Sequence, residues 1–336
     1  MDAERARRPV AVLAGGTGFI GRHLSSALAE EGYEVRGIDR RGIDIPWGDP
    51  HAIRSVVEGA SLLVNLAGRS VNCRYTDANR EQILASRLET TRQLREAVAG
   101  VRNPPPLWIN ASTATIYRYA LDRPQTERDG EVGTGFSVDV ARNWEREFFA
   151  GELPGVRRVA IRTSIVIGDG DATALLLTLA RLGLGGTQHD GWWFGHRRYR
   201  GIGPDPSGNG RAPWHRSRGR QMFSWIHVRD VVRAVQHIRD TPGLAGPVNL
   251  SAPTPVPNDE LMRSLRRVVR AWAGVPSLRW MIELATAAMR TESELVLKSR
   301  WVLPERLLES GFRFEYEQVG QALGAAASSP ALSSTG

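Results

Sequence analysis

The sequence predicts an α/β protein: a doubly wound parallel sheet followed by a smaller, mainly helical C-terminal part. Short runs rich in Val, Ile and Leu alternate with helix-like stretches of a dozen or more residues, and a glycine-rich turn directly follows the first run. This alternation is typical of βαβ units. It weakens after Gly168, and at 336 residues the chain is long enough for a second domain.

The regular elements gather in the N-terminal half. Strands are expected over 10–14, 33–38, 60–66, 107–111 and 156–161, and helices over 22–31, 77–99 and 138–149. Further on, a helix is expected over 172–182, strands over 223–228 and 248–250, and helices over 259–273 and 277–290. The tail over 324–336, GAAASSPALSSTG, has the composition of a disordered segment.

Composition excludes several classes of function. The single cysteine, Cys73, allows neither an internal disulfide nor a cysteine-based zinc site, and no metal site is expected. No apolar run approaches the roughly 20 residues needed to cross a bilayer, so we expect a cytoplasmic protein without a membrane partner. Of the 44 basic residues only one, Lys298, is a lysine. A mechanism that needs a lysine in the N-terminal half is therefore excluded.

The net charge of +8 is concentrated in one segment. Between His189 and Arg220 there are seven arginines but only two aspartates, together with several tryptophans and histidines. A nucleic-acid-binding protein more often distributes its cations along a folded face or within a known motif. No such motif is present, so no nucleic-acid partner is expected. The segment 189–218 has two interpretations, a lid over a flat or anionic substrate, or an arginine-rich surface loop.

Three glycines between the first strand and the first helix predict a nucleotide site. Gly15, Gly18 and Gly21 allow a tight turn, a close approach of backbone amides to a pyrophosphate, and close helix–sheet packing. Asp39 ends the second strand 18 residues after Gly21, where an acidic residue accepts a hydrogen bond from a ribose 2′-hydroxyl. The pattern is that of a Rossmann-type dinucleotide-binding domain. The expected turn residues are Gly15, Thr17, Gly18, Phe19, Ile20 and Gly21.

The choice between NAD and NADP stays open. The carboxylate of Asp39 would repel a 2′-phosphate and favour NAD, whereas Arg40 and Arg41 could pair with that phosphate and favour NADP. The expected domains are a dinucleotide-binding domain over 1–170, to which 223–250 return, and a substrate-binding region over 171–222 and 251–323.

Several motifs, in order along the chain, resemble a known superfamily. GGTGFIG at 15–21, VNLAG at 64–68, SRLETTRQL at 86–94, NAST at 110–113 and FSWIHVRDVVRA at 223–234 are similar to extended short-chain dehydrogenases/reductases. NWERE at 143–147, GPVNLSAP at 246–253 and VLPERLLESGFRFEY at 302–316 resemble its atypical, epimerase-like branch, which has its own C-terminal domain. The resemblance implies cofactor contacts by Asp49, Leu66, Ala67, Gly68, Ser86 and Arg162. From the residues alone, Asp49 could equally be a cap, and Ala67 with Gly68 a tight strand end.

One departure from that superfamily decides the expected chemistry. Its reductases and epimerases use a Tyr-x-x-x-Lys pair, and the matching positions here hold Ser137 and Ala141; the epimerase-like branch also lacks the pair. Epimerisation must first oxidise an alcohol and needs a base on its O–H. Reduction of a ketone needs only an oriented hydride donor and a stabilised alkoxide. The sequence therefore favours an NAD(P)H-dependent ketoreductase.

The candidate catalytic residues follow the fourth strand. Ser112, in the place of the superfamily's catalytic serine, and Thr113 could hydrogen-bond the alkoxide, with the proton supplied by water or the substrate. Tyr117 is expected to shape the substrate pocket, with a role as the acid as the alternative. His227, on an apolar strand, is expected to be a core histidine, and Asp230 is expected to cap the helix that follows.

Members of the superfamily that lack the tyrosine, such as the ketoreductase of simocyclinone biosynthesis, reduce a ketone on a polycyclic aromatic polyketide. The resemblance thus implies a bulky ketone as the small-molecule partner, a role in antibiotic biosynthesis, and a monomer or homodimer. Two alternatives stay open. One is a nucleotide-sugar epimerase or dehydratase whose base comes from elsewhere, such as Tyr117; the other is a non-catalytic dinucleotide-sensing protein.

Overall fold

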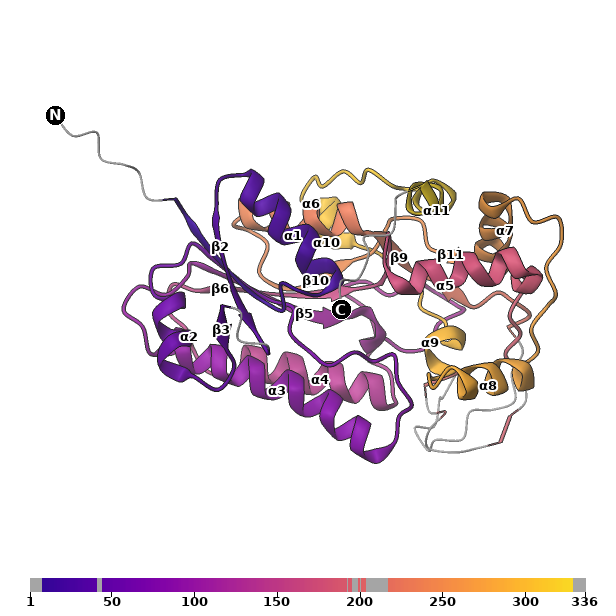
Figure 1. Cartoon of the computed structure of the whole chain (residues 1–336), viewed down its shortest axis with the longest axis horizontal. Helices are drawn as coiled ribbons and strands as arrows, with labels where there is room; N and C mark the ends of the chain where they lie inside the picture. Colours follow the sequence, from indigo (N-terminus) through magenta and orange to yellow (C-terminus); the bar gives the residue numbers. More distant parts are fainter. Residues whose placement is uncertain are drawn as a thin grey trace.

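A seven-stranded parallel sheet forms the centre of the molecule (Figure 1). The computed structural model describes residues 8–40, 44–191, 193–194, 199, 201–203 and 217–328. The strand order is β10-β6-β5-β4-β1-β2-β3, and every neighbouring pair is parallel. The strands are β1 (Val10–Ala14), β2 (Glu34–Asp39), β3 (Ile45–Pro46), β4 (Leu62–Asn65), β5 (Leu107–Thr113), β6 (Arg157–Thr163) and β10 (Gly246–Leu250).

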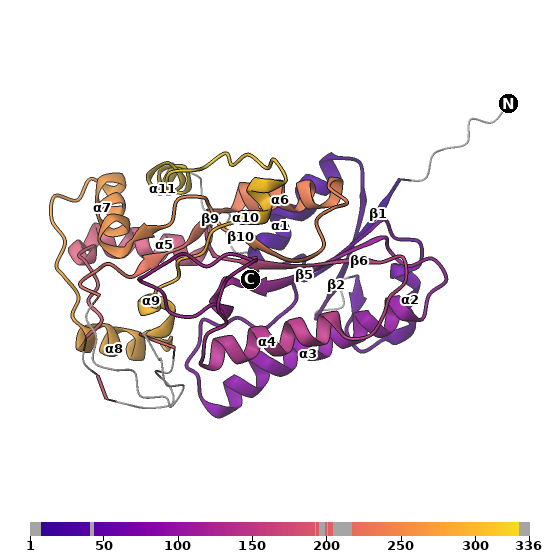
Figure 2. The ribbon, with the colours of Figure 1, turned by 180° about the vertical axis from the view of Figure 1, so that it is seen from behind.

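Helices cover both faces of this sheet, as Figures 1 and 2 show. One face carries α1 (Phe19–Glu30), α6 (Val228–Asp240) and α10 (Glu305–Glu309). The other carries α2 (Pro50–Val57), α3 (Asp77–Ala99) and α4 (Phe136–Phe149). The doubly wound architecture predicted from the sequence is confirmed.

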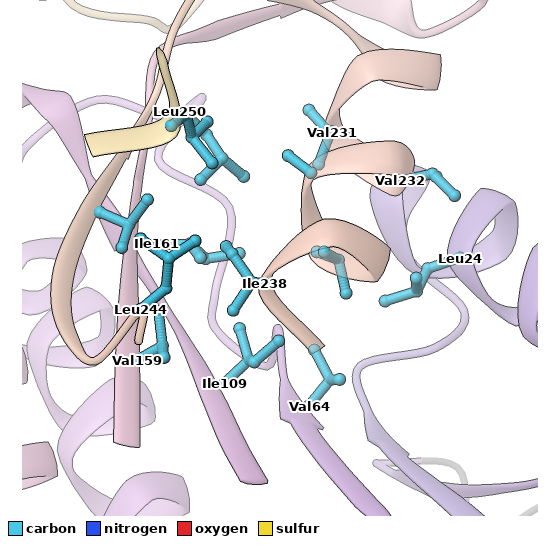
Figure 3. Packing of buried hydrophobic residues seen from close by; sticks show 14 of the residues in the cluster. Leu24, Val64, Ile109, Val159, Ile161, Val231, Val232, Ile238, Leu244 and Leu250 are labelled. Atoms are coloured by element: carbon cyan, nitrogen blue, oxygen red, sulfur yellow. The ribbon is translucent and has the colours of Figure 1, made fainter. Parts of the chain in front are cut away.

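The period-two alternation of β1 explains the two cores. Leu13 packs with α1 and α6 on one face, whereas Val12 and Ala14 pack with α2 and α3 on the other. Figure 3 shows the first core: apolar side chains of the sheet, such as Ile109 and Ile161, point at the apolar stripe of α6. Burial of both faces fixes the strand register, and with it the position of every strand end.

The remaining elements form the second, mainly helical part. Two small sheets pair β7 (Ile165–Ile167) with β9 (Trp225–His227) and β8 (Met222–Phe223) with β11 (Val256–Pro257). The helices are α5 (Asp171–Leu179) with a π-type extension (Ala180–Leu184), α7 (Asn258–Val269), α8 (Arg279–Ala288), α9 (Glu294–Leu297) and α11 (Val319–Ser328). Within the described part of the chain, no helix is long and apolar enough to cross a membrane.

The end of the chain corrects one expectation. Helix α11 continues to Ser328, so disorder does not begin at residue 324 as predicted. Leu323 and Ala326 are buried against α5 and α7, and this apolar contact orders a segment whose composition alone suggested a flexible tail. Residues 329–336 of that predicted tail lie outside the described residues.

A second correction concerns the start of α6. The helix begins at Val228, and His227 is its cap: Nδ1 accepts a hydrogen bond from the Arg229 N–H at 3.3 Å. Asp230, expected to cap a helix from residue 231, lies inside the first turn and is fully buried. Its carboxylate accepts the backbone N–H groups of Glu315 (2.8 Å) and Tyr316 (2.9 Å), so it anchors the C-terminal segment instead. His227 itself is a buried core residue, as predicted, and burial lowers its pKa to about 4.

Candidate functional site

The glycine-rich turn between β1 and α1 is packed too closely for side chains at two of its three glycines. A Cβ on Gly15, which has a φ of +81°, would lie 2.9 Å from the backbone nitrogen of Ala67. A Cβ on Gly21 would lie 2.7 Å from the Gly16 Cα. Gly18 differs: its Cβ would meet only the Gly15 oxygen, at 3.3 Å. Gly15 and Gly21 are needed for the turn, and Gly18 leaves one side of the backbone open to a ligand.

The start of α1 has the character of an anion site. Gly18 precedes the helix with no side-chain cap, so the first amide N–H groups of α1 have no side-chain acceptor. Thr17 and Gly18 are exposed, while Phe19 and Ile20 are half-buried and hold the helix on the molecule. The turn residues predicted from the sequence therefore form a cradle that fits a pyrophosphate.

The residues expected to determine the preference for NAD or NADP lie at and just after the end of the neighbouring strand, β2. Asp39 is 8% exposed at the carboxyl end of β2, and the backbone oxygen of Ile38 accepts the Gly15 N–H at 3.1 Å. The strand end therefore lies against the glycine turn. Arg40 follows and is exposed, and Arg41 lies outside the described residues.

Three of the other expected cofactor residues follow β4. Leu66 is half-buried, Ala67 is buried and donates its N–H to the side-chain oxygen of Asn65 (3.0 Å), and Gly68 is exposed. A hydrogen bond from the Asn65 side-chain amide to the Asn110 side-chain oxygen (2.7 Å) holds this strand end against β5. The Leu66 N–H donates to the Ala14 oxygen at 2.8 Å, so this strand end lies beside the glycine turn. The cofactor contacts that the resemblance implies for these residues stay a prediction.

Two further cofactor candidates have local structural roles. Asp49 is the cap of α2 and accepts the N–H groups of His51 (3.1 Å) and Ala52 (3.0 Å), which was its alternative interpretation. Ser86 accepts the Arg69 N–H at 3.0 Å, and its hydroxyl donates to the backbone oxygen of Ile83 at 3.1 Å. A contact of either residue with a cofactor stays a prediction.

A buried hydrogen-bond network holds three of the sequence candidates. The Ser112 hydroxyl donates to Glu145 (2.6 Å), and Arg162 donates twice to the same carboxylate (2.8 and 2.7 Å). Arg162 also donates to the Tyr117 oxygen (2.9 Å), and the Tyr117 hydroxyl donates to Asn249 (3.0 Å). The network joins β5, α4, β6 and β10. Ser112, Tyr117 and Arg162 are thus engaged by neighbouring side chains of the fold.

Burial also sets the chemistry of Tyr117. It raises the pKa of the phenol above its ordinary value, and the adjacent Arg162 guanidinium opposes part of this effect. The phenol is therefore protonated at neutral pH, and its proton is directed at Asn249. This arrangement fits a pocket-shaping residue better than a base.

Thr113 differs from its neighbour Ser112. Successive strand residues point to opposite faces, and Thr113 is only half-buried. Its oxygen accepts the Thr115 N–H at 3.2 Å, and the two threonine hydroxyls lie 2.9 Å apart. Thr115 belongs to the 3₁₀ turn η1 (Ala114–Ile116) that ends β5. Thr113 thus caps this turn, and the half-buried residues Thr113 and Thr115 place two neighbouring hydroxyls at the end of β5.

Helix α4 lies beside η1, where Ala141 is buried among Ala114 and Ile116. Of the two positions that match the missing Tyr-x-x-x-Lys pair, Ala141 therefore packs against the turn that ends β5. Ser137 is half-buried and its hydroxyl donates to Glu294. Ala141 is fully buried and carries no functional group.

Sequence reasoning missed the residue that approaches this position from the C-terminal part. The Nζ atom of Lys298 donates to the backbone oxygen of Thr115 (2.9 Å) and lies 3.8 Å from the Glu294 carboxylate. The signal in the sequence was its rarity, a single lysine among 43 arginines, together with a glutamate four residues earlier. The single lysine of the chain thus reaches η1 from the C-terminal part.

The two ends of the arginine-rich segment are joined. The backbone N–H and the hydroxyl of Ser217 donate to one oxygen of Asp190 (2.8 and 2.7 Å), and the Tyr119 hydroxyl donates to the other (3.0 Å). Tyr119 belongs to the stretch of chain that follows β5 and η1, so both ends of the segment meet this stretch. Residues 192, 195–198, 200 and 204–216 lie outside the described residues. The lid interpretation therefore stays a prediction.

A doubly wound parallel sheet with a close-packed glycine turn after its first strand defines a dinucleotide-binding protein of the Rossmann type. Residues 11–136 match the NAD dependent epimerase/dehydratase family, and residues 279–326 match a domain of unknown function, DUF1731. The epimerase family protein SDR39U1 of Bos taurus is 30% identical over 93% of this chain and 97% of its own length. The epimerase family protein YfhF of Bacillus subtilis is 28% identical over 93% of this chain and 95% of its own.

Among solved structures, human epimerase family protein SDR39U1 (isoform 2) with NADPH superposes with a TM-score of 0.77 at 25% identity, over 95% of this chain and 99% of that one. This chain belongs to the NAD-dependent epimerase/dehydratase family. Its cofactor is NAD or NADP, as predicted. The further resemblance to polyketide ketoreductases gains no support from these relatives, whose names describe epimerase-family proteins.

Proposed function

We propose that this chain is a nicotinamide-dependent ketoreductase with an atypical active site at the carboxyl end of β5. The observation that carries the proposal is that Thr113 is a half-buried residue at this strand end, where its hydroxyl caps η1 and takes no part in the buried Ser112–Glu145–Arg162–Tyr117 network. A hydroxyl in this position can hydrogen-bond the oxygen of a ketone and stabilise the alkoxide that forms there.

The glycine turn and the ends of β2 and β4 would hold the cofactor. The uncapped start of α1 would bind the pyrophosphate, and Asp39 with Arg40 would lie at the adenosine ribose. When bound, the reduced nicotinamide supplies a hydride. The protein contributes orientation and stabilisation of charge on the substrate oxygen, which together can remove several kcal/mol from a barrier.

Reduction fits these residues better than epimerisation. Epimerisation of a sugar must oxidise an alcohol, which requires a base near its O–H. Ser137 and Ala141 provide neither a phenolate nor an amine, and the Tyr117 proton is held by Asn249. Reduction of a ketone makes a smaller demand on the side chains, since the cofactor supplies the hydride and the substrate oxygen then has to gain a proton, with no O–H proton to be removed first.

The substrate we propose is bulky and aromatic. At the described edge of the arginine-rich segment, the guanidinium of Arg279 lies over the rings of Trp193 (5.8 Å) and Tyr199 (5.3 Å). Phe194 between them in the sequence is largely exposed. Aromatic faces of this kind suit a flat apolar ligand, and a polycyclic ketone is the substrate class that combines these features.

Thr113→Val should lower kcat for ketone reduction by about 10²-fold, because it removes one hydrogen-bond donor to the developing alkoxide while keeping the shape of the side chain. Ser112→Ala and Tyr117→Phe should cost much less, since both hydroxyls serve the buried network. Steady-state reduction of a polycyclic ketone, with dinucleotide affinity measured separately, checks this. If Tyr117→Phe alone eliminates turnover and Thr113→Val does not, a tyrosine acid exists and the assignment of Thr113 is wrong.

Asp39→Ala should weaken NAD binding and improve NADP binding relative to it, since the ribose loses an acceptor and the repulsion of a 2′-phosphate disappears. Arg40→Ala should do the reverse and weaken NADP binding alone. Titration of each variant with both reduced cofactors, followed by nicotinamide fluorescence, measures the change. Equal affinities in all three proteins would place both side chains away from the ribose.

A nucleotide-sugar epimerase is the second candidate, because a nucleoside-diphosphate sugar epimerase from Corynebacterium glutamicum is similar at 25% identity with a TM-score of 0.67, covering 95% of this chain and 58% of that one. Incorporation of solvent deuterium into a nucleotide sugar would favour it. Stoichiometric cofactor binding without consumption across a panel of ketones would instead favour a non-catalytic dinucleotide sensor.

A further inference from the structure

We propose that Lys298, acting through Glu294 and Ser137, supplies the proton that the substrate oxygen takes up at the carboxyl end of β5. The inference rests on the proposed reduction and assigns its proton source. It makes Lys298 and Glu294 positioning residues that act through Ser137, whose side chain is the partly exposed one of the three.

The position of the three side chains carries the proposal. Helix α9, which contains Glu294, lies beyond the carboxyl ends of the strands (Figure 1). Glu294 accepts the Ser137 hydroxyl on α4, and Lys298 donates to the Thr115 oxygen in η1 at 2.9 Å. The Glu294–Lys298 pair thus bridges the two elements that border Thr113.

Burial makes this pair unusual. Glu294 is 3% exposed and Lys298 is 2% exposed, yet the ammonium lies 3.8 Å from the carboxylate and makes its described hydrogen bond to a neutral carbonyl. Removing an ammonium from water is costly even with a carboxylate at this distance, and loss of the proton relieves that cost. Burial lowers the pKa of Lys298 to about 8, with Glu294 opposing the shift and Arg300 adding to it.

Among the charged and titratable groups around the pair, Arg300 and Tyr75 keep their charge state near neutral pH, whereas Lys298 changes its charge. Arg300, which is also buried, keeps a guanidinium charge throughout the working range. Tyr75 faces Glu294, Glu292 and Arg300, and burial raises the pKa of its phenol, so it stays neutral. Glu292 accepts the Tyr75 backbone N–H at 2.5 Å.

The proton reaches the substrate oxygen from Lys298 through Glu294 and Ser137. Hydride addition to the carbonyl carbon leaves an alkoxide, and the Ser137 O–H bond breaks to form the O–H bond of the alcohol. The Lys298 ammonium protonates the Glu294 carboxylate when the pair closes to hydrogen-bond distance. The resulting carboxylic acid passes that proton to the Ser137 oxygen, and Glu294 is a carboxylate again. Lys298 ends as a neutral amine and is protonated again by water.

The single lysine allows a direct test. In the full chain labelled with ¹³Cε-lysine, NMR should show one lysine side-chain signal that titrates with a midpoint near pH 8, not near the ordinary value of 10.5. In Glu294→Gln the midpoint should move to lower pH, because the attraction of the carboxylate for the ammonium is lost. A midpoint near 10.5 in the wild-type protein, or a midpoint that Glu294→Gln leaves unchanged, overturns the proposal.

Kinetics provide the second readout. Wild-type kcat should fall as the pH rises through about 8, since the proton-bearing lysine disappears. Lys298→Met and Glu294→Gln should each lower kcat by about 10²-fold at neutral pH and remove that limb of the profile, with the dinucleotide Kd unchanged. Glu147→Gln is the control: Glu147, near the other end of α4, pairs with Arg95 at 3.0 Å in a partly buried position, and the pH limb should persist.

A wrong role for Lys298 and a wrong proposed function give different results. Variants that fold and retain the wild-type kcat and pH limb overturn the role of Lys298 while the proposed reduction stands. If Lys298→Met does not fold, Glu294→Gln, which removes one charge and keeps the side-chain shape, decides in the same way. A wild-type protein that reduces no carbonyl overturns the proposed function, and this inference with it.

Discussion

Gly18→Val should abolish nicotinamide-dinucleotide binding in a protein that still folds. Gly18 has a φ of −74° and a ψ of 172°, an extended conformation that any residue adopts, and a Cβ there would meet only one protein atom closely. The branched side chain would instead occupy the space in which backbone amides approach the pyrophosphate. We expect the Kd to rise by at least about 10²-fold, or roughly 2.7 kcal/mol.

Calorimetric titration with reduced cofactor, beside a thermal melt, measures both parts of this prediction. Gly243→Val is the matched control: it also has open space around its Cβ, but it lies in the loop before β10, away from the glycine turn. Its affinity and melting temperature should both stay at the wild-type values. A folded Gly18→Val variant with wild-type affinity would place the cofactor somewhere other than the start of α1.

Arg162→Leu should destabilise the protein strongly. Arg162 and Glu145 are each only 11% exposed, and the arginine makes two hydrogen bonds to Glu145 and one to Tyr117. Removing it leaves a buried carboxylate without a counterion, which costs about 3–5 kcal/mol. We expect Tm to fall by roughly 6–10 °C. The loss of stability should be smaller at acidic pH, because the Glu145 carboxyl left without its partner takes up a proton.

A double variant separates the charge from the packing. Arg162→Leu combined with Glu145→Gln removes the stranded charge as well, so it should be more stable than Arg162→Leu alone. Arg36→Leu is the surface control: Arg36 pairs with Glu34, both about half exposed, and its loss should leave Tm almost unchanged. An Arg162→Leu variant as stable as Arg36→Leu would mean that the network contributes little to the fold.

The elements that the sequence predicted well are those with local signals. The long helix α3 has its predicted bounds, because the Thr76 hydroxyl caps its start and Gly100 ends it. The glycine turn carries its own geometric requirements, so its three glycines could be assigned before the fold was known. The epimerase-like assignment rested on several motifs in order and is confirmed by the family match.

The rest depends on contacts that sequence periodicity does not contain. Ser112 and Thr113 are adjacent, and only the fold shows that Ser112 meets Glu145 while Thr113 stays partly exposed. Asp230 resembled a helix cap, but a segment some 85 residues away uses its carboxylate. Lys298 reaches Thr115 across 183 residues of sequence. In each case the decisive partner is distant in the chain.

The most direct test of the reduction follows the hydride. The protein should transfer deuterium from nicotinamide cofactor deuterated at C4 to the carbinol carbon of a polycyclic ketone, and mass spectrometry of the alcohol should show one deuterium for each cofactor oxidised. The opposite result is a cofactor that binds but is never oxidised by any ketone, or a nucleotide sugar that exchanges solvent deuterium with no net loss of reduced cofactor. Either would contradict a ketoreductase at the end of β5.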